Sequence, residues 1–117
     1  MRHRDKKLGL NISSNRKDLL IGNLATSLIL HEKIQTTESK AKALQGVMER
    51  LINTASKNNE KDAIRSVGAI LHGDLSSKKL MQELVKRYKD KKSGYTRITK
   101  IGFRAGDAAS MVQIELI

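Results

Sequence analysis

The sequence predicts an α+β protein of two layers, in which helices pack against a small three-stranded mixed sheet. Apolar side chains recur every three or four positions in four segments between residues 14 and 88, as in amphipathic helices. They alternate from residue 112 to residue 116, which is the period of a half-buried strand. Two other short runs are rich in β-branched residues. The expected order is therefore helix, strand, three helices and two strands.

An extended basic arm precedes the first helix. Residues 1–13 have no usable periodicity, so we expect them to be extended, with residues 14–117 forming the globular body of a single domain. Ser13 and Ser14 have hydroxyl groups that can cap the free N–H groups at a helix start. The first helix is therefore predicted to begin at this serine pair.

The first helix is predicted to end near His31. Leucine recurs every four positions from Leu20 to Leu28 and gives one apolar stripe, although Gly22 weakens the early turns because glycine has a low helix propensity. The KIQTT segment that follows, residues 33–37, is short and β-branched. We expect it to form a brief strand.

The second and third helices follow this strand. The apolar pattern between residues 41 and 55 is the clearest helical signal in the chain, and it ends in the turn-forming asparagines of residues 57–60. A third helix is predicted from about Glu60 to Leu71. The residues expected on its buried side are Ile64, Val67, Ile70 and Leu71.

A fourth helix is predicted to be capped by Ser76 or Ser77. Its apolar residues recur at helical spacing, and its lysines lie outside this stripe. The apolar stripe consists of Leu80, Met81, Leu84, Val85 and Tyr88. The lysines expected to face water are Lys78, Lys79, Lys86 and Lys89.

The last two strands are predicted to form an antiparallel hairpin. Residues 95–103 are less regular than the final strand because Ile98 and Ile101 have opposite parity, and a bulge near Gly102 would reconcile them. Residues 104–109 are too small and polar for a core, so we expect a loop of about six residues. The KIQTT strand can then add to this hairpin.

The composition excludes several kinds of protein. The 117 residues contain no Cys, which excludes disulfides, thiolate metal sites and thiol nucleophiles and favours a reducing cytoplasm. No apolar stretch has the length of a signal peptide or of a membrane span. We therefore expect no membrane partner.

The charge is concentrated in two segments. The net charge is +11 and the pI is near 10.1, which favours anionic partners such as nucleic acid. Residues 1–17 contain six basic and one acidic side chain, a net charge of +5, and residues 86–104 contain eight basic and one acidic, a net charge of +7. The rest of the chain therefore has a net charge of −1.

No arrangement of catalytic residues is present. Gly102 and Gly106 are not followed by the Lys-Ser or Lys-Thr of a phosphate-binding loop, and no nucleophile elbow occurs. His3, His31 and His72 lie far apart and have no acidic neighbours at metal-ligand spacing. We therefore expect no enzymatic activity, no cofactor, no metal and no small-molecule substrate.

Both basic segments are candidates for binding nucleic acid. The arm can place guanidinium groups on phosphates within a groove, although such an arm can also be only a solubilising tail. In the second segment Tyr88 continues a helical stripe, so Tyr95 is the better candidate to stack on an unpaired base. With one Phe and two Tyr in the chain, charge and shape must dominate, which favours a folded nucleic acid.

Several motifs occur in the order found in one known family. They are MRHR, SSNRK, NLATSLI, HEKIQTTESKAKAL, RYKDKKSGYTRI and FRAGDAASMVQIELI. The sequence resembles the bacterial large-subunit ribosomal protein L17 family along essentially its whole length. It departs from the family at Asn15, where His is usual, and at Asp5 and Lys6, where Gly-Arg is frequent.

The resemblance implies a structural, RNA-binding role in the large ribosomal subunit of the cytoplasm, near the outer opening of the nascent-peptide tunnel. The implied partners are 23S rRNA and neighbouring large-subunit proteins, with ribosomal protein L32 as one candidate. We expect the arm, the start of the first helix and the hairpin with its preceding loop to converge on one rRNA surface. The residues expected to bind RNA are Arg2, His3, Arg4, Lys6, Lys7, Ser13, Ser14, Arg16, Lys17, Lys40, Lys42, Arg87, Lys89, Lys91, Lys92, Tyr95, Thr96, Arg97, Lys100 and Arg104.

Two other functions are compatible with a basic composition. A free nucleic-acid-binding protein, such as a nucleoid or regulatory protein that acts off the ribosome, is not distinguished by composition alone. A binder of acidic membranes would need a basic amphipathic helix, whereas the most basic segments here are expected to be loop and strand.

Overall fold

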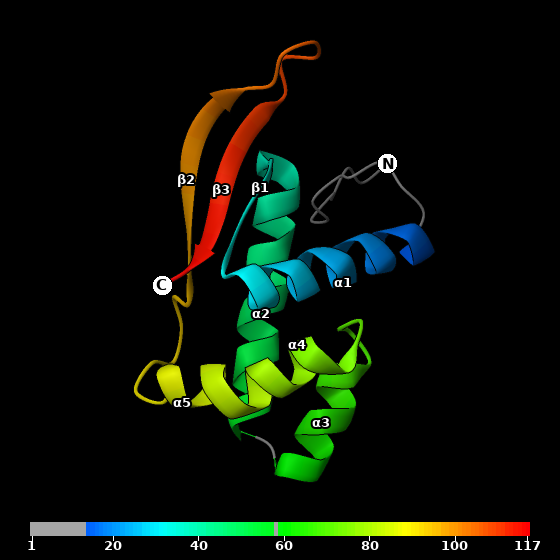
Figure 1. Ribbon diagram of the computed structural model, residues 1–117, viewed down its shortest axis with the longest axis vertical. Coiled ribbons are helices and arrows are strands. Elements are labelled where there is room, and N and C mark those ends of the chain that lie inside the picture. The colour runs from blue at the N-terminus through cyan, green and yellow to red at the C-terminus, as the bar shows by residue number, and fades with distance from the viewer. Residues whose placement is uncertain (1–13, 58) are drawn as a thin grey trace, which may run out of the picture.

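The computed structural model describes residues 14–57 and 59–117 and contains the predicted succession of elements (Figure 1). Helix α4, the π-helical turn η1 and helix α5 follow one another without a break, so they form one helical stretch. The elements are α1 (Ser14–His31), β1 (Lys33–Thr37), α2 (Glu38–Lys57), α3 (Glu60–Gly68), α4 (Asp74–Lys79), η1 (Leu80–Leu84), α5 (Val85–Arg87), β2 (Thr96–Phe103) and β3 (Ser110–Leu116). This order confirms the predicted α+β class.

The sheet has the strand order β1-β3-β2, and both pairings are antiparallel. Ile114 in the central strand pairs with Ile34 on one side and with Ile98 on the other. The prediction of a mixed sheet was therefore wrong. The side-chain period of a strand defines which residues share a face, but it does not define the direction of the neighbouring strand.

The hairpin between β2 and β3 agrees with the prediction. Its strands are joined by residues 104–109, and the register shifts between Lys100 and Gly102. The shift leaves Ile101 without a cross-strand partner, which is the extra residue of a bulge. The opposite parities of the two isoleucines in β2 are thereby reconciled.

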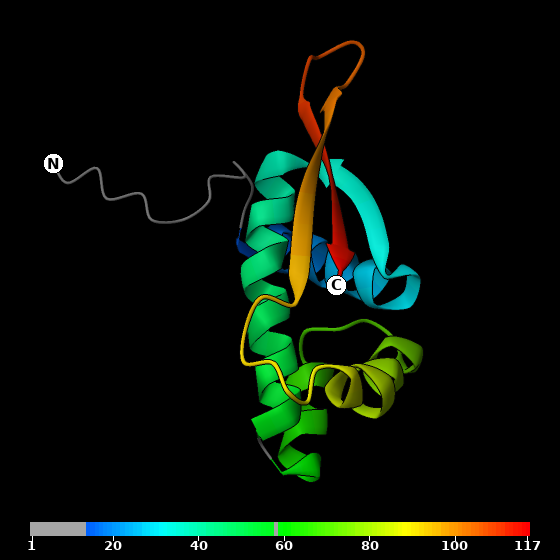
Figure 2. The same cartoon turned by 90° about the vertical axis from the view of Figure 1, so that its left-hand side faces the viewer.

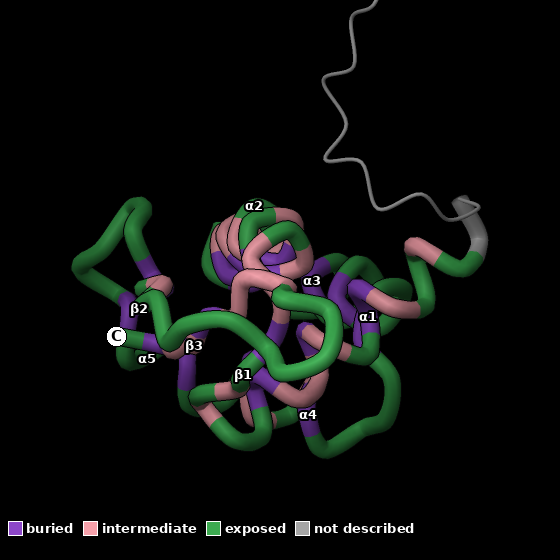
Figure 3. The backbone as a smooth tube through the Cα atoms, turned by 90° about the horizontal axis from the view of Figure 1, so that it is seen from above, coloured by how far each residue is buried: buried purple, intermediate pink, exposed green. Residues whose placement is uncertain are grey.

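One face of the sheet packs on the helices. Val112, Ile114 and Leu116 are buried at alternate positions of β3, as predicted. Helix α2 lies at the centre, because it contacts α1, α3, η1 and all three strands. Figure 3 shows the buried positions toward the middle of the molecule, with exposed positions along most of its outline. The buried residues of α2 are Ala41, Leu44, Met48, Leu51, Ile52 and Ala55.

Helix α3 is shorter than predicted and turns a different side to the core. It ends at Gly68, and its buried residues are Ala63 and Val67. Ile64 lies about 100° further around the helix than Ala63 and is 49% exposed. Ile70, beyond the helix end, is also exposed, so the prediction that these two isoleucines are buried was wrong.

Helix α4 begins at Asp74, earlier than the predicted capping serines. Ser76 is buried within the helix, and its hydroxyl donates a hydrogen bond to the carbonyl of Gly73 at 3.1 Å. It therefore does not cap free N–H groups, and the prediction of this cap was wrong. The apolar stripe that ends at Tyr88 is buried or half-buried, as predicted.

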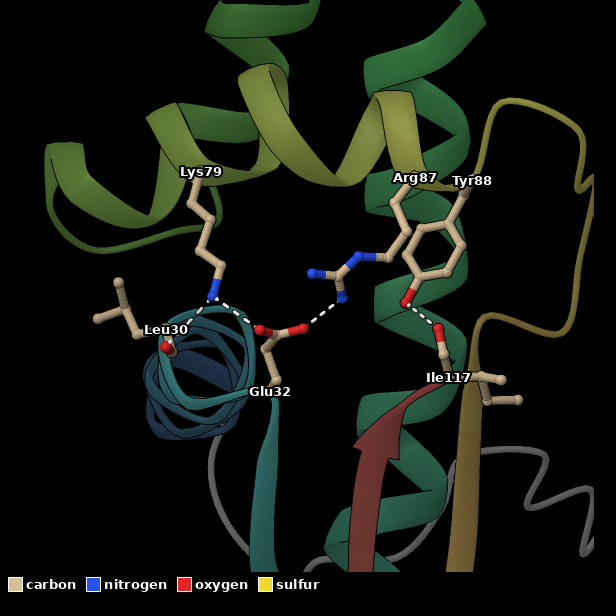
Figure 4. Close-up of polar contacts among 6 residues, drawn as sticks. All are labelled: Leu30, Glu32, Lys79, Arg87, Tyr88 and Ile117. Atoms are coloured by element: carbon tan, nitrogen blue, oxygen red, sulfur yellow. Dashed lines mark hydrogen bonds and ion pairs between the residues drawn. The ribbon is translucent and has the colours of Figure 1, made fainter.

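A polar cluster joins this helical stretch to the junction of α1 and β1 (Figure 4). The carboxylate of Glu32 accepts hydrogen bonds from Lys79, at 3.4 Å, and from Arg87. The Arg87 guanidinium lowers the pKa of Glu32. Lys79 was predicted to face water, but the turn after α1 brings a carboxylate to it. Beside this pair, the Tyr88 hydroxyl donates to the carbonyl of Ile117 at 2.9 Å.

Candidate nucleic-acid interface

Part of the predicted RNA-binding set lies outside the described residues, so its role stays a prediction. This part consists of Arg2, His3, Arg4, Lys6, Lys7 and Ser13. Ser14 is the first residue of α1. In the same helix Arg16 is exposed and Lys17 is half-buried.

The loop between α5 and β2 crosses the outer side of α2 (Figure 2). The backbone N–H of Gly94 donates to Glu49 at 3.1 Å, and the Tyr95 hydroxyl donates to Asn53 at 2.6 Å. Glu49 and Asn53 are one turn apart on α2, so these two bonds fix the loop against the helix. Three lysines of the loop are exposed and have no ion pair within the described part of the chain. They are Lys89, Lys91 and Lys92.

Tyr95 is a core residue and not a stacking platform. Its side chain is 1% exposed and packs against Tyr88, with ring centroids 5.1 Å apart and planes inclined by 57°. Burial raises the pKa of its hydroxyl. Thr96 is also buried. Because the start of β2 turns both side chains inward, their burial argues against base stacking by Tyr95 and against a side-chain contact of Thr96 with RNA. RNA contact at these two positions stays a prediction.

The two arginines of the hairpin already hold carboxylates. Arg97 donates from Nε and Nη2 to Glu115 Oε1 on β3, at 2.8 and 2.6 Å. Arg104 donates from Nε to Asp107 Oδ1 at 3.1 Å and from Nη2 to Oδ2. The Arg104 guanidinium, helped by the N–H of Ala109, lowers the pKa of Asp107 to about 2. Both guanidinium groups are thus occupied within the hairpin.

Arg97 and Lys100 lie on opposite faces of the sheet. Arg97 pairs with Glu115 and Lys100 pairs with Val112, and these two residues of β3 are three positions apart. Val112 is buried against the helices, so Lys100 is on the helical face and Arg97 is on the open face. One flat RNA surface cannot contact both side chains through the same face of β2.

Lys42 and Lys100 approach a carboxylate at the N-terminal end of α2. Glu38 forms an ion pair with Lys42 at 3.2 Å and accepts a hydrogen bond from the Ser110 hydroxyl at 3.0 Å. The pKa of Glu38 is lowered mainly by Lys42, then by Ser110, and also by the charge of Lys100. Lys40 is half-buried, two residues from Glu38 along the helix.

The early turns of α1 border a cavity that α2 also lines. Asp18 and Leu19 line a cavity of about 560 Å³ together with Val47, Arg50 and Thr54 of α2. This cavity and the loop before β2 border an exposed strip of α2 from two sides. The expected convergence of the arm, the start of α1 and the hairpin on one rRNA surface stays a prediction. The tip of the hairpin lies elsewhere, beyond the N-terminal end of α2 (Figure 1).

Sequence reasoning missed two cations on this strip. Arg50 and Lys57 are exposed on the same side of α2, because they are seven residues apart. This spacing on the polar side of the clearest helical pattern was the signal that could have identified them. We call the surface formed by Arg50, Lys57, Lys89, Lys91 and Lys92 the α2 basic surface.

A family model for ribosomal protein L17 matches residues 20–117. The chain belongs to the ribosomal protein L17 family. It is 42% identical to the large ribosomal subunit protein bL17 of Sulfurimonas denitrificans over 117 residues, which is the full length of both chains. It is 42% identical to bL17 of Desulforudis audaxviator over 112 residues, which cover 96% of this chain and 97% of that one. With bL17 of Rickettsia canadensis it shares 43% identity over all 117 residues, 85% of that chain.

The other chemistry available to this L17-family protein is limited. In residues 14–57 and 59–117, no three His, Cys, Asp or Glu side chains are grouped as a metal ion would require. None of the helices in the same ranges is long and apolar enough to cross a membrane. The α2 basic surface offers ammonium and guanidinium donors, which suit an anionic partner.

Proposed function

We propose that this L17-family protein is a structural constituent of the large ribosomal subunit that binds large-subunit rRNA. The observation that supports this most directly is the α2 basic surface, whose loop lysines have no carboxylate partner among the described residues. The relatives named large ribosomal subunit protein bL17 supply the identity of the particle. In this proposal the protein binds rRNA and helps to define the shape of the subunit, and it catalyses no reaction.

Counterion release is the main source of affinity for such a surface. Each cation that neutralises a phosphate releases condensed counterions, so the affinity falls steeply as the salt concentration rises. Lysine ammonium groups act as point charges without a fixed bonding geometry. The α2 basic surface therefore suits the folded backbone of rRNA better than a particular base sequence.

The basic arm belongs to the same proposal. Its cations precede α1, whose residues Asp18 and Leu19 line a cavity together with Arg50 of the α2 basic surface. Arg16 and Lys17 would extend the contact from the arm to the helix. Neighbouring large-subunit proteins, L32 among the candidates, and a cytoplasmic location in the ribosome complete the proposal.

Charge reversal tests whether the position of the cations matters. Lys91→Glu with Lys92→Glu places two carboxylates on the α2 basic surface, whereas Lys61→Glu with Lys78→Glu makes the same change of net charge on α3 and α4. We expect the first pair to reduce co-sedimentation with large subunits in sucrose gradients much more than the second. Equal losses would mean that only the total charge matters, contrary to the proposal.

The wild-type chain gives the decisive comparison with a free nucleic-acid-binding protein. At physiological salt we expect it in the large-subunit fractions of a cell lysate. If it sediments outside these fractions while still binding RNA or DNA, it acts off the ribosome and the proposed function is wrong.

A further inference from the structure

The tip of the β2–β3 hairpin exposes two large apolar side chains. Ile101 is 51% exposed and Phe103, the single Phe of the chain, is 79% exposed. Figures 1 and 2 both show the hairpin extending past the end of α2, so the helical layer does not cover its tip. The bulge frees Ile101 from cross-strand pairing. Two large apolar side chains exposed two positions apart make this tip a candidate contact surface.

The tip is held in one shape before any partner is present. The backbone N–H of Arg104 donates to the carbonyl of Ala109 at 2.8 Å, and the N–H of Ala108 donates back to Arg104 at 3.0 Å. At its base, the Ser110 hydroxyl is bonded to Glu38 of α2. A preformed tip loses little conformational entropy on binding, which favours affinity.

The charge of the tip distinguishes it from the α2 basic surface. From Gly102 to Ala109 the chain has one basic and one acidic residue, Arg104 and Asp107, and these two are paired with each other. The segment therefore has no net charge, and its guanidinium group is already hydrogen-bonded to a carboxylate on two nitrogens. Counterion release on RNA needs unpaired cations, which the tip lacks. A neutral, apolar projection instead matches an apolar pocket on a protein.

We propose that the tip of the β2–β3 hairpin, with Ile101 and Phe103 as anchors, docks into an apolar pocket of a neighbouring large-subunit protein. This inference rests on the proposed function, since it places the partner in the same particle. The protein would then use two separate surfaces, with lysines for rRNA and the hairpin tip for a protein.

Photo-crosslinking from the tip identifies the class of partner. The photoreactive residue p-benzoyl-phenylalanine replaces Phe103 in the full chain, and a second chain has it in place of Leu75, which is 73% exposed on α4 at a distance from the hairpin (Figure 1). Purified large subunits that contain each chain are irradiated. We expect a ribonuclease-resistant protein adduct from position 103 at least about tenfold stronger than from position 75. An RNA adduct at position 103, or equal yields from the two positions, would overturn the inference.

A double substitution separates the tip from RNA binding. Ile101→Ser with Phe103→Ser removes both anchors, and Leu75→Ser is the matched exposed control. We expect affinity for protein-free large-subunit rRNA to stay within about twofold of wild type, while release from subunits during a salt wash becomes about tenfold faster than for the control. Because all three residues are exposed, the thermal midpoint should not change.

The failure of the inference and the failure of the proposed function give different results in these experiments. If the double substitution weakens binding to protein-free rRNA as strongly as it weakens retention, the tip contacts RNA and the inference is wrong, while the proposed function stands. If the wild-type chain neither binds this rRNA nor enters the subunit, the proposed function itself is wrong.

Discussion

Gly22 of α1 lies against His72 in the connection between α3 and α4. A Cβ atom at Gly22 would lie 2.6 Å from His72 Nε2 and 2.7 Å from the carbonyl oxygen of Ile70. Thr26, one turn later, accepts a hydrogen bond from the His72 N–H at 3.0 Å and donates to the Gly22 carbonyl at 2.8 Å. The glycine that weakens α1 as an isolated helix is therefore required for this close contact.

Gly22→Ala should lower the free energy of unfolding by about 1–3 kcal/mol, because the backbone carbonyl of Ile70 must move to admit a methyl group. Gly46→Ala is the control, since Gly46 also lies inside a helix but has no atom within 4 Å of its added Cβ. It should raise the free energy of unfolding by about 0.5–1 kcal/mol. Urea unfolding measures both, and stabilisation by Gly22→Ala would contradict the contact.

Glu32→Gln should lower the free energy of unfolding by about 1 kcal/mol at pH 7, because two partly exposed ion pairs are lost. The sign of the pH dependence follows from the lowered pKa. A carboxyl group whose pKa is lowered by folding stabilises the fold at pH values above its unfolded pKa, which is near 4.5. This contribution is lost as the pH falls through the folded pKa. The difference between wild type and variant should therefore shrink below about pH 4.5. Glu83→Gln, on the exposed side of η1, is the control, and an equal effect there would refute the role of Glu32.

Tyr95→Phe should destabilise the fold without affecting RNA binding. The change removes the hydroxyl that donates to Asn53 at 2.6 Å, which should cost about 1 kcal/mol. Because the ring is buried against Tyr88, the affinity for large-subunit rRNA should be unchanged. Thermal unfolding and filter binding on the same samples measure the two quantities. A loss of affinity with unchanged stability would show that the Tyr95 hydroxyl contacts RNA, contrary to this prediction.

The sequence predicted the elements well because their signals are local. Helical spacing located α1 and α2 to within a few residues, and the mismatch in parity between Ile98 and Ile101 located the bulge. Local spacing does not determine which of two adjacent apolar positions faces a partner. Ile64 is therefore exposed, while the smaller Ala63 is buried against the core.

The candidate site was less predictable because it depends on contacts between distant residues. Arg97 and Arg104 stood out as cations, but their carboxylate partners are visible only when the hairpin is formed. Tyr95 was interleaved with lysines in the sequence, yet packing of the loop on α2 turns it inward. Charge patterning located the basic segments and could not show which cations are already neutralised.

The carboxyl group of Asp107 should titrate with a midpoint near 2, because the Arg104 guanidinium stabilises its charged form. Carbon-13 chemical shifts of the side chain measure this midpoint. Arg104→Ala should move it toward 3.8, the ordinary value for Asp. A midpoint for Asp107 that Arg104→Ala leaves unchanged would show that the pair does not form in solution.

The salt dependence of rRNA binding should separate the free lysines from the paired arginine. Lys91→Ala with Lys92→Ala removes two cations from the α2 basic surface, so the slope of log affinity against log salt should become shallower by about 1.4–1.8. Arg104→Ala should leave the slope unchanged, because the charge of Arg104 is compensated by Asp107 and Arg104 therefore releases no counterion from RNA. Filter binding to protein-free large-subunit rRNA between about 50 and 200 mM salt gives the slopes. If Arg104→Ala flattens the slope as much as a lysine does, the hairpin tip contacts phosphate after all.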